Sequence, residues 1–251
     1  MEPAMQVSSK QDLKALQEVG AIVAGCLRSL QRRVRPGVTT LELDDVARRY
    51  LATHEARSAP ELSYQFPGIT CISVNPAVAH GIPGKYRLKP GDLVNIDVSA
   101  EKNGYFADTG GSFQVPPRSP EVQRLLRATR EALMAGIAVA RAGVAVREIG
   151  GAIEEVALKR GFTVIENLGS HGVGRSLHEA PKFIASYRDP RDRRILKEGN
   201  VITIEPFLST GATWAEQRKD GWTLAVGRSF HTAQFEHSLV ITRGKARLLT
   251  V

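Results

Sequence analysis

The chain repeats part of its own sequence, and this repeat constrains its fold more than any other feature. The segment LKPGDLVNIDV, residues 88–98, returns as LKEGNVITIEP, residues 196–206, with an acid near the end of each apolar run. Upstream, RPGVTTLELDDVARRYL, residues 35–51, returns as RAGVAVREIGGAIEEVA, residues 141–157, at nearly the same spacing. Two matches at nearly one spacing indicate two halves of similar structure, because a repeated sequence encodes a repeated supersecondary unit.

Each half shows the same order of elements. Apolar residues recur with helical periodicity over roughly residues 9–33 and 120–142, and Ser119 stands where a helix N-cap is expected. A Gly-Val bend, a second helical segment and β-type runs follow in both halves. The pattern predicts helix, helix and then antiparallel strands, twice.

The two halves predict an α+β fold with a pseudo-two-fold axis. Residues 9–115 and 119–251 would join their strands into one antiparallel sheet, with helices on one face and a cleft at the centre. Residues 1–251 would then form a single domain. Two separate halves are the alternative, but the segment between them, PPRSP at residues 116–120, is too short for a linker.

A predicted hairpin in the first half carries two acids. Asn103 and Gly104 tolerate the positive φ of a type I′ turn, so the flanking runs should pair. A turn at these two residues places Asp97 opposite Gly110 and Asp108 on the diagonal, whereas a turn one residue earlier places the two acids opposite each other. Both registers leave the carboxylates on one face, because side chains alternate along a strand. The pair is either half of a metal site or two solvated carboxylates beside a turn.

The repeat extends this acidic set. Asp97 aligns with Glu205, and AQFEHSLVIT, residues 233–242, places Glu236 on a final β-type run. With Asp108, these residues form four carboxylates that converge across the pseudo-two-fold. Two divalent cations would neutralise their charge, so the sequence predicts a two-metal site.

Three histidines stand out among the six in the chain. His171 lies in the glycine-containing segment GSHGVG, where the backbone can approach a site closely, and His178 follows seven residues later in HEAP. His80 belongs to the segment AVAHGIPG. Oxygen-rich ligation with a single imidazole favours Mn, Fe or Co over tetrahedral structural zinc.

Composition indicates the setting in which the protein works. The net charge is +8, but the basic residues are scattered, which predicts loose electrostatic association with polyanions such as the ribosome and no specific nucleic-acid site. Cys26 and Cys71 offer no disulfide framework, and no window approaches the roughly 18 apolar residues of a membrane span. The N-terminus also lacks the apolar core of a secretory signal. We therefore expect a cytoplasmic protein without a membrane segment, acting as a monomer.

Six motifs together resemble those of a known family. They are HGIP, NIDV, YFADTG, HGVGRSLHEAP, TIEP and QFEHS, and they occur in this order across nearly the whole chain. This series is similar to that of the type I methionine aminopeptidases, metallopeptidases of the pita-bread fold with a curved sheet. The resemblance implies a catalytic domain that removes the initiator methionine from nascent polypeptide N-termini when the second residue is small. It also implies two divalent metal ions per chain, Co, Mn or Fe, with Zn or Ni as alternatives.

The resemblance assigns metal-binding roles by position. Asp97 would chelate one ion, Asp108 and Glu236 would bridge both ions, and His171 with Glu205 would complete the site of the other ion.

Catalytic and substrate-binding roles follow in the same way. The expected mechanism is two-metal hydrolysis of a peptide bond, in which the pKa of a bridging water falls from about 15.7 towards roughly 7 and Glu205 acts as general base. His178 and one metal would stabilise the oxyanion, and His80 would lie near the peptide. The residues implied to contact substrate are Tyr64, Cys71, His80, Leu177, His178 and Trp222.

The chain departs from the common pattern of that family at two positions. Leu177 precedes His178 where Phe is usual, and Ala79 precedes His80 where Cys is frequent. Two rival interpretations also remain: a proline-specific peptidase of the same fold, whose members carry a large N-terminal domain, and a binding protein that has lost its metals. The five intact ligand positions favour a metalloenzyme.

Overall fold

The computed structural model describes residues 4–251, so the first three residues of the expected domain 1–251 lie outside it. The helices are α1 (Lys10–Gln31), α2 (Thr40–Thr53), α3 (Ala59–Tyr64), α4 (Pro120–Val139) and α5 (Arg147–Lys159). The strands of the first half are β1 (Arg57–Ser58), β2 (Cys71–Val74), β3 (Ala77–Ala79), β4 (Leu93–Lys102) and β5 (Tyr105–Gln114). Those of the second half are β6 (Thr163–Val164), β7 (Gly169–Gly172), β8 (Glu179–Ala185), β9 (Val201–Ile204), β10 (Phe207–Ser209), β11 (Glu216–Gln217), β12 (Leu224–Ala225), β13 (Thr232–Gln234), β14 (His237–Val240) and β15 (Arg247–Leu248).

The two long helices begin where their capping residues require. Ser9 and Asp12 form a reciprocal capping box at the start of α1, in which each side chain accepts a hydrogen bond from the other residue's backbone N–H. At the start of α4 the Ser119 side chain accepts from the backbone N–H of Val122. The predicted cap at Ser119 is confirmed, and both helices end two or three residues before the expected limits.

Matched residues of the internal repeat make matched hydrogen bonds. The Gly37 N–H donates to the Leu88 carbonyl at 2.7 Å, and the Gly143 N–H donates to the Leu196 carbonyl at 2.9 Å. Both glycines have positive φ, 88° and 86°, a conformation that favours glycine because it lacks Cβ. The repeat in the sequence therefore corresponds to a repeat of backbone structure.

The first of the two expected hairpin registers is confirmed. Strands β4 and β5 pair antiparallel around a turn at Asn103 and Gly104, whose φ values are 52° and 79°. Asp97 lies opposite Gly110, and Asp108 lies opposite Ser99. The two carboxylates therefore share one face of the hairpin as diagonal neighbours.

The run expected as one final strand is interrupted, which corrects the sequence interpretation. Residues 233–242 contain the end of β13 and all of β14, while Phe235 and Glu236 lie between the two strands, and β15 follows later in the chain. Phe235 bridges to Gly111, and the Glu236 N–H donates to the Gly110 carbonyl at 3.0 Å. The chain leaves the β13 ladder here because it pairs with β5 instead, and this contact joins the two halves.

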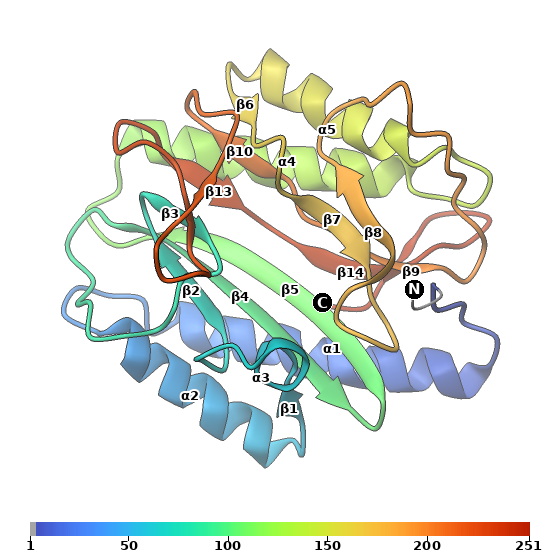
Figure 1. Ribbon diagram of the computed structural model, residues 1–251, viewed down its shortest axis with the longest axis horizontal. Helices are drawn as coiled ribbons and strands as arrows, with labels where there is room; N and C mark the ends of the chain where they lie inside the picture. Colours follow the sequence, from blue (N-terminus) through green and yellow to red (C-terminus); the bar gives the residue numbers. More distant parts are fainter. Residues whose placement is uncertain (1–3) are drawn as a thin grey trace.

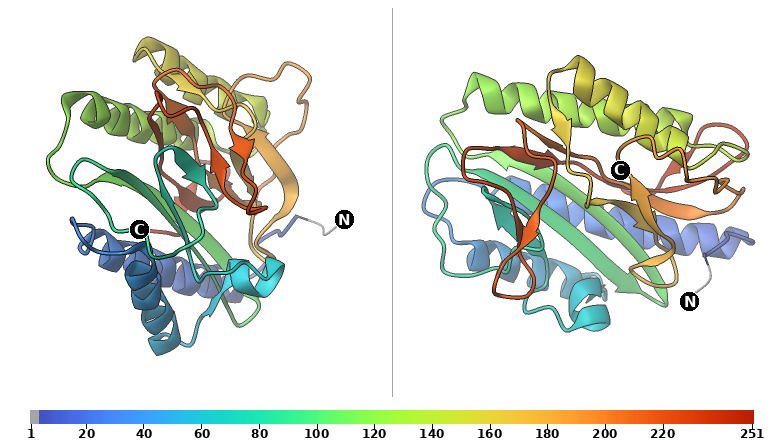
Figure 2. Two further views of the ribbon diagram at one scale, coloured as in Figure 1. Left: turned by 60° about the vertical axis from the view of Figure 1, so that its left-hand side comes forward. Right: turned by 45° about the horizontal axis from the view of Figure 1, so that its top comes forward.

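The strand ladders are all antiparallel and the helices cover them in two pairs. Sheets have the orders β1-β4-β2 with β5 beside β4, β15-β14-β9-β7-β8, β13-β10-β6 and β11-β12-β3. Figure 1 shows α1 crossing behind the β4–β5 hairpin, α2 below it, and α4 and α5 above the strands of the second half. The views in Figure 2 show the same separation of the helix pairs. This arrangement agrees with a pseudo-two-fold that passes through the central strands.

Side chains from each half enter the core of the other. The cluster between α1, α2 and the first-half strands includes Val173, Val201 and Leu249 from the second half. The cluster beneath α4 and α5 includes Leu93 from β4. Burial of apolar surface therefore stabilises the two halves jointly, at about 25 cal/mol per Å². None of the helices within residues 4–251 is long and apolar enough to cross a membrane.

Candidate metal centre

Three predicted ligands form a compact buried group. Asp108 of β5, His171 of β7 and Glu236, between β13 and β14, each offer a ligand atom, and these atoms lie within 4.8 Å of one another. All three residues are at least nine-tenths buried. Strands from both halves thus deliver carboxylate and imidazole groups to one point.

The other two predicted ligands border this group. Asp97 on β4 is the diagonal neighbour of Asp108 on the same face of the hairpin and also lines a cavity beside the group. Glu205 follows β9, and its Oε1 lies 3.3 Å from Nε2 of His171. The structure therefore brings together all five residues expected to bind metal.

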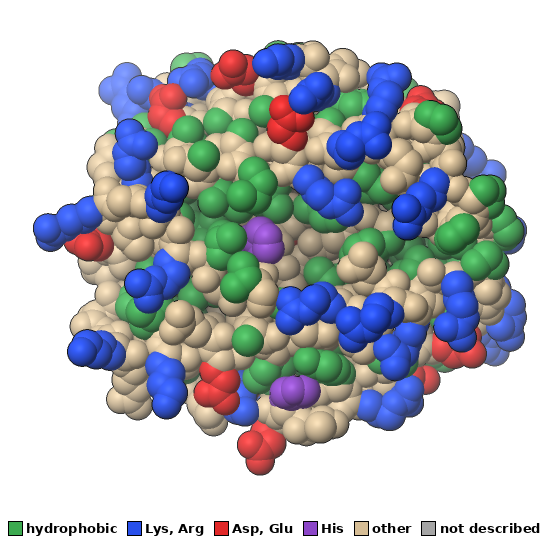
Figure 3. Space-filling view, turned by 180° about the vertical axis from the view of Figure 1, so that it is seen from behind, with side chains coloured by type: hydrophobic (Ala, Val, Ile, Leu, Met, Phe, Trp, Pro, Cys, Tyr) green, Lys and Arg blue, Asp and Glu red, His purple; other side chains and the backbone are tan. Residues whose placement is uncertain are grey.

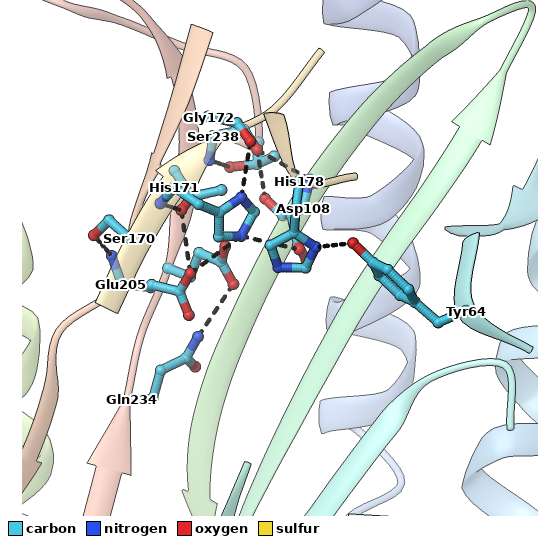
Figure 4. A network of polar contacts seen from close by, with 12 residues as sticks. Tyr64, Asp108, Ser170, His171, Gly172, His178, Glu205, Gln234 and Ser238 are labelled. Carbon is cyan, nitrogen blue, oxygen red and sulfur yellow. Dashed lines mark hydrogen bonds and ion pairs between the residues drawn. The ribbon is translucent and has the colours of Figure 1, made fainter. Parts of the chain in front are cut away.

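The protonation of His171 shows that this cluster suits a cation. Its Nδ1 lies 2.9 Å from the Gly172 carbonyl, which can only accept, so Nδ1 carries the proton (Figure 4). Burial lowers the pKa of His171 to about 4, so the ring is neutral at pH 7 and Nε2 presents a lone pair. This lone pair faces oxygens of Glu205 and Asp108 at 3.3 and 3.9 Å. Such an arrangement of electron-rich atoms is repulsive unless a proton or a metal cation lies among them.

The carboxylates also indicate that this cluster binds a cation. Asp108 Oδ1 and Glu236 Oε1 are buried and have no hydrogen-bond partner within residues 4–251. Burial and neighbouring acids raise the pKa values of Asp108, Glu205 and Glu236 well above the ordinary range, and burial raises that of Asp97 to about 6. Unpartnered carboxylate oxygens beside an imidazole lone pair match the donor set that divalent cations use. The residues present fit a divalent metal ion.

A cavity of about 240 Å³ opens beside the cluster. Every residue predicted to contact substrate lines it, namely Tyr64, Cys71, His80, Leu177, His178 and Trp222. Asp97, Asp108, His171 and Glu205 form part of its wall, whereas Glu236 does not line it. Cys71 and Leu177 are almost fully buried, and Tyr64 is 45% exposed at the rim.

His178 is held between two aromatic neighbours. Its ring lies against that of His171, with centroids 4.0 Å apart and the planes tilted by 35°, and its Nδ1 lies 2.8 Å from the hydroxyl of Tyr64 (Figure 4). Burial, with smaller contributions from the other basic groups nearby, lowers the pKa of His178 to about 3. The ring is therefore neutral at pH 7, with one nitrogen able to donate a hydrogen bond.

His80 occupies an unusual backbone position. Its φ is 53°, in the left-handed region that residues with a side chain rarely adopt. The next residue, Gly81, packs so closely on β2 that an added Cβ would lie 2.4 Å from the Ile72 carbonyl oxygen. The His-Gly pair thus places an imidazole on the cavity wall by a backbone path that a bulkier neighbour could not follow.

Three polar residues that support the ligands are absent from the sequence prediction. Each stands two residues before a predicted acid: Asn95 before Asp97, Thr203 before Glu205 and Gln234 before Glu236. Thr203 Oγ1 donates to Glu205 at 3.2 Å, and Gln234 Nε2 donates to Glu236 at 3.1 Å. Residues two positions apart on a strand have their side chains on the same face, so the sequence alone could have predicted that these polar residues lie beside the acids. The cavity also includes Phe66, Lys182 and Phe183, for which the motifs gave no signal.

The chain is similar to known proteins along almost its whole length. The model of metallopeptidase family M24 matches residues 14–243. Methionine aminopeptidase 2 of Bacillus subtilis (strain 168) is 44% identical over 247 residues, which cover 98% of this chain and 99% of that protein. The crystal structure of methionine aminopeptidase from Rickettsia prowazekii superimposes with a TM-score of 0.93 and 34% identity, covering 98% of this chain and 100% of that one. These matches confirm the predicted pita-bread fold.

A prolidase structure supplies a useful contrast. The prolidase of Pyrococcus furiosus has a TM-score of 0.78 and 22% identity, and the match covers 98% of this chain but only 66% of that one. Such a likeness shows the fold alone.

Proposed function

Because the chain belongs to metallopeptidase family M24, we propose that it is an aminopeptidase that removes the N-terminal methionine from nascent proteins and peptides with a small second residue. The observation that carries this proposal is the neutral His171, whose lone pair faces buried carboxylates on the wall of a cavity. The full-length similarity to methionine aminopeptidases supports the choice of substrate. The preference for a small second residue follows the resemblance of the motifs.

We assign the five ligands to two divalent ions, with Co, Mn or Fe as the expected metals. Asp97 would hold one ion, His171 and Glu205 the other, and Asp108 and Glu236 would contact both. The ions supply Lewis-acid chemistry that makes a water molecule nucleophilic near neutral pH.

The protein's own groups would move the protons. Glu205 lies on the cavity wall with its Oε1 3.3 Å from Nε2 of His171, so its ionised carboxylate would accept the proton that an attacking water loses. The Tyr64 hydroxyl would donate to Nδ1 of His178, which places the ring proton on Nε2. That N–H would then donate to the oxygen that becomes negative when the peptide carbonyl is attacked.

The cavity suits an unbranched thioether side chain. Cys71, Leu177, Trp222 and Phe66 give it an apolar and partly aromatic lining. Sulfur–aromatic contacts contribute about 0.3–1.5 kcal/mol each, which favours methionine over an aliphatic residue of similar size. His80, also on this wall, would lie near the peptide backbone of the substrate.

We further propose the cellular setting. Two free buried cysteines agree with a reducing cytoplasm, and both halves supply ligands, which supports one catalytic domain acting as a monomer. Figure 3 shows Lys and Arg side chains spread over the face behind the view of Figure 1, with Asp and Glu among them. With a net charge of +8, this distribution supports loose electrostatic contact with the ribosome and no specific nucleic-acid site.

Hydrolysis of short peptides by metal-free and metal-loaded protein tests the proposal. Met-Ala-Ser should be cleaved after Mn, Co or Fe is added to metal-free protein, whereas Leu-Ala-Ser and an Xaa-Pro dipeptide should not. Preferential cleavage of the Xaa-Pro substrate would instead indicate a prolidase. Full cleavage of Met-Ala-Ser in excess chelator, with no metal found by elemental analysis, would refute the metal-dependent mechanism.

A further inference from the structure

The side chain of Gln234 lies beside the metal-binding cluster and contacts one of its acids directly (Figure 4). The residue is completely buried. Its Nε2 donates to Oε2 of Glu236 at 3.1 Å. A neutral amide thus contacts one of the five proposed ligands, which lies two residues away on the same run of chain.

Asn95 determines which end of the Gln234 amide faces the acids. Asn95 Nδ2 donates to Oε1 of Gln234 at 2.8 Å, and the same nitrogen lies 3.2 Å from Oγ of Ser112. Ser112 Oγ also accepts from the backbone N–H of Gln234 at 2.9 Å. Because the amide oxygen is occupied by a donor, the NH₂ group must point towards the carboxylates. All three residues are buried, so water does not compete for these bonds.

Gly110 provides the space for this amide. A Cβ at Gly110 would lie 2.5 Å from Oε1 and 2.6 Å from Nε2 of Gln234. Gly110 is also the residue opposite Asp97 in the hairpin, and its carbonyl accepts from the Glu236 N–H at 3.0 Å. The hairpin therefore carries a glycine at the position where the second half inserts its glutamine.

We propose that Gln234 is a positioning residue: its amide, oriented by Asn95 across the junction of the two halves, holds Glu236 so that one oxygen is fixed and the other is free to bind metal. Gln234 donates a hydrogen bond to Oε2 of Glu236. Oε1 of Glu236 has no hydrogen-bond partner within the described residues 4–251. The amide adds no charge to the site, so it orients the acid without competing for the cation. This inference rests on the proposed metal-dependent function.

The expected effect is a loss of metal affinity. Residues that orient metal ligands typically change affinity by about 10–100-fold when they are removed. Gln234→Met keeps a similar side-chain volume and removes the donor, so Glu236 loses its fixed orientation. Asn95→Leu leaves Gln234 in place and frees its amide to rotate, so a smaller loss of a few-fold to about tenfold is expected.

Gln114→Met is the matched control. Gln114 is also a buried glutamine, on β5, but its side chain bonds to Ser119 and Gln123 near the start of α4. The same chemical change at that position should lower stability without changing metal affinity.

Isothermal titration of Mn²⁺ into each metal-free protein, with circular dichroism to verify folding, provides the test. The double variant Asn95→Leu/Gln234→Met should bind Mn²⁺ like Gln234→Met alone, because Asn95 acts only through the amide that is missing. Independent structural damage would instead give additive losses, and so would overturn the proposal. Affinities of Gln234→Met and Asn95→Leu within threefold of the unchanged protein would also overturn it, as would an equal loss in Gln114→Met. Absence of Mn²⁺ binding by the unchanged protein would refute the metal site itself, and this inference with it.

Discussion

The metal-free protein should lose stability as the pH rises above about 6.5. Burial and mutual repulsion raise the pKa values of Asp108, Glu205 and Glu236 well above the ordinary range, whereas in the unfolded chain these groups ionise near pH 4. A carboxyl with a raised pKa favours the folded state at low pH, and this contribution is lost as the pH rises through the folded-state value. The free energy of unfolding should therefore fall with pH wherever the folded protein retains protons that the unfolded chain has released.

The fall in the free energy of unfolding is best measured between about pH 6.5 and 8. Below this window, and to a smaller extent in its lower part, the depressed pKa values of His80, His171, His178 and His237 act in the opposite direction, because the unfolded chain takes up protons first, near pH 6.5. Above it, unfolded cysteines begin to ionise, near pH 8.5. Asp97, with a pKa of about 6, is already largely ionised in this window. Each proton that one of the other three acids retains while the unfolded chain has lost it lowers stability by about 1.4 kcal/mol per pH unit.

Urea unfolding followed by circular dichroism at four pH values measures this slope. In chelator, the free energy of unfolding should fall from pH 6.5 to 8, and saturating Mn²⁺ should remove the decrease because the cations stabilise the ionised acids. Asp108→Asn should reduce the slope in metal-free protein, since one of the retained protons is gone. A metal-free stability that stays constant or rises across this window would refute the assignment of these acids as a mutually repelling cluster.

Three further predictions concern individual side chains. His171→Ala should weaken Mn²⁺ binding and activity together, because a metal ligand is lost. His178→Ala should leave Mn²⁺ binding nearly intact and lower kcat by roughly 10²–10³-fold. If titration and steady-state kinetics give the reverse result, the roles assigned to the two histidines are exchanged. Tyr64→Phe should lower kcat by up to about tenfold, with unchanged metal affinity, because the hydrogen bond that orients His178 is lost. Leu177→Phe should change the preference between Met- and Leu-initiated peptides. It should also lower the free energy of unfolding by about 1–3 kcal/mol, because Leu177 is only 3% exposed. An altered Mn²⁺ affinity would show that Leu177 contacts the metal ligands instead.

Much of the metal centre followed from local rules. The Asn103-Gly104 turn fixes the hairpin register, and strand alternation then places Asp97 and Asp108 on one face. The internal repeat identified Glu205 because it aligns with Asp97 at the end of a matched apolar run. These features depend on residues close together in the sequence or on the repeat itself, so they can be predicted from the sequence alone.

Features that depend on the meeting of the two halves could not be predicted in the same way. The break at Glu236 lies in a continuous β-type run, and only the competing contact with β5 interrupts it. The hydrogen bond between Asn95 and Gln234 joins residues 139 positions apart. No local propensity specifies such a pair, although the polar residue two positions before Asp97, Glu205 and Glu236 indicates that a partner is needed.

The distance in sequence between the two halves of the site also affects how the protein is made. Asp97 and Asp108 leave the synthesis machinery on their hairpin long before Glu236, since the contacts that unite them span about 130 residues. At roughly 5–20 residues per second, that interval is on the order of ten seconds. His171 and Glu205 emerge during it, and Glu236 is the last of the five proposed ligands to appear. We therefore expect the complete set of proposed ligands only in a chain that has reached Glu236, and a polypeptide released earlier would lack this acid.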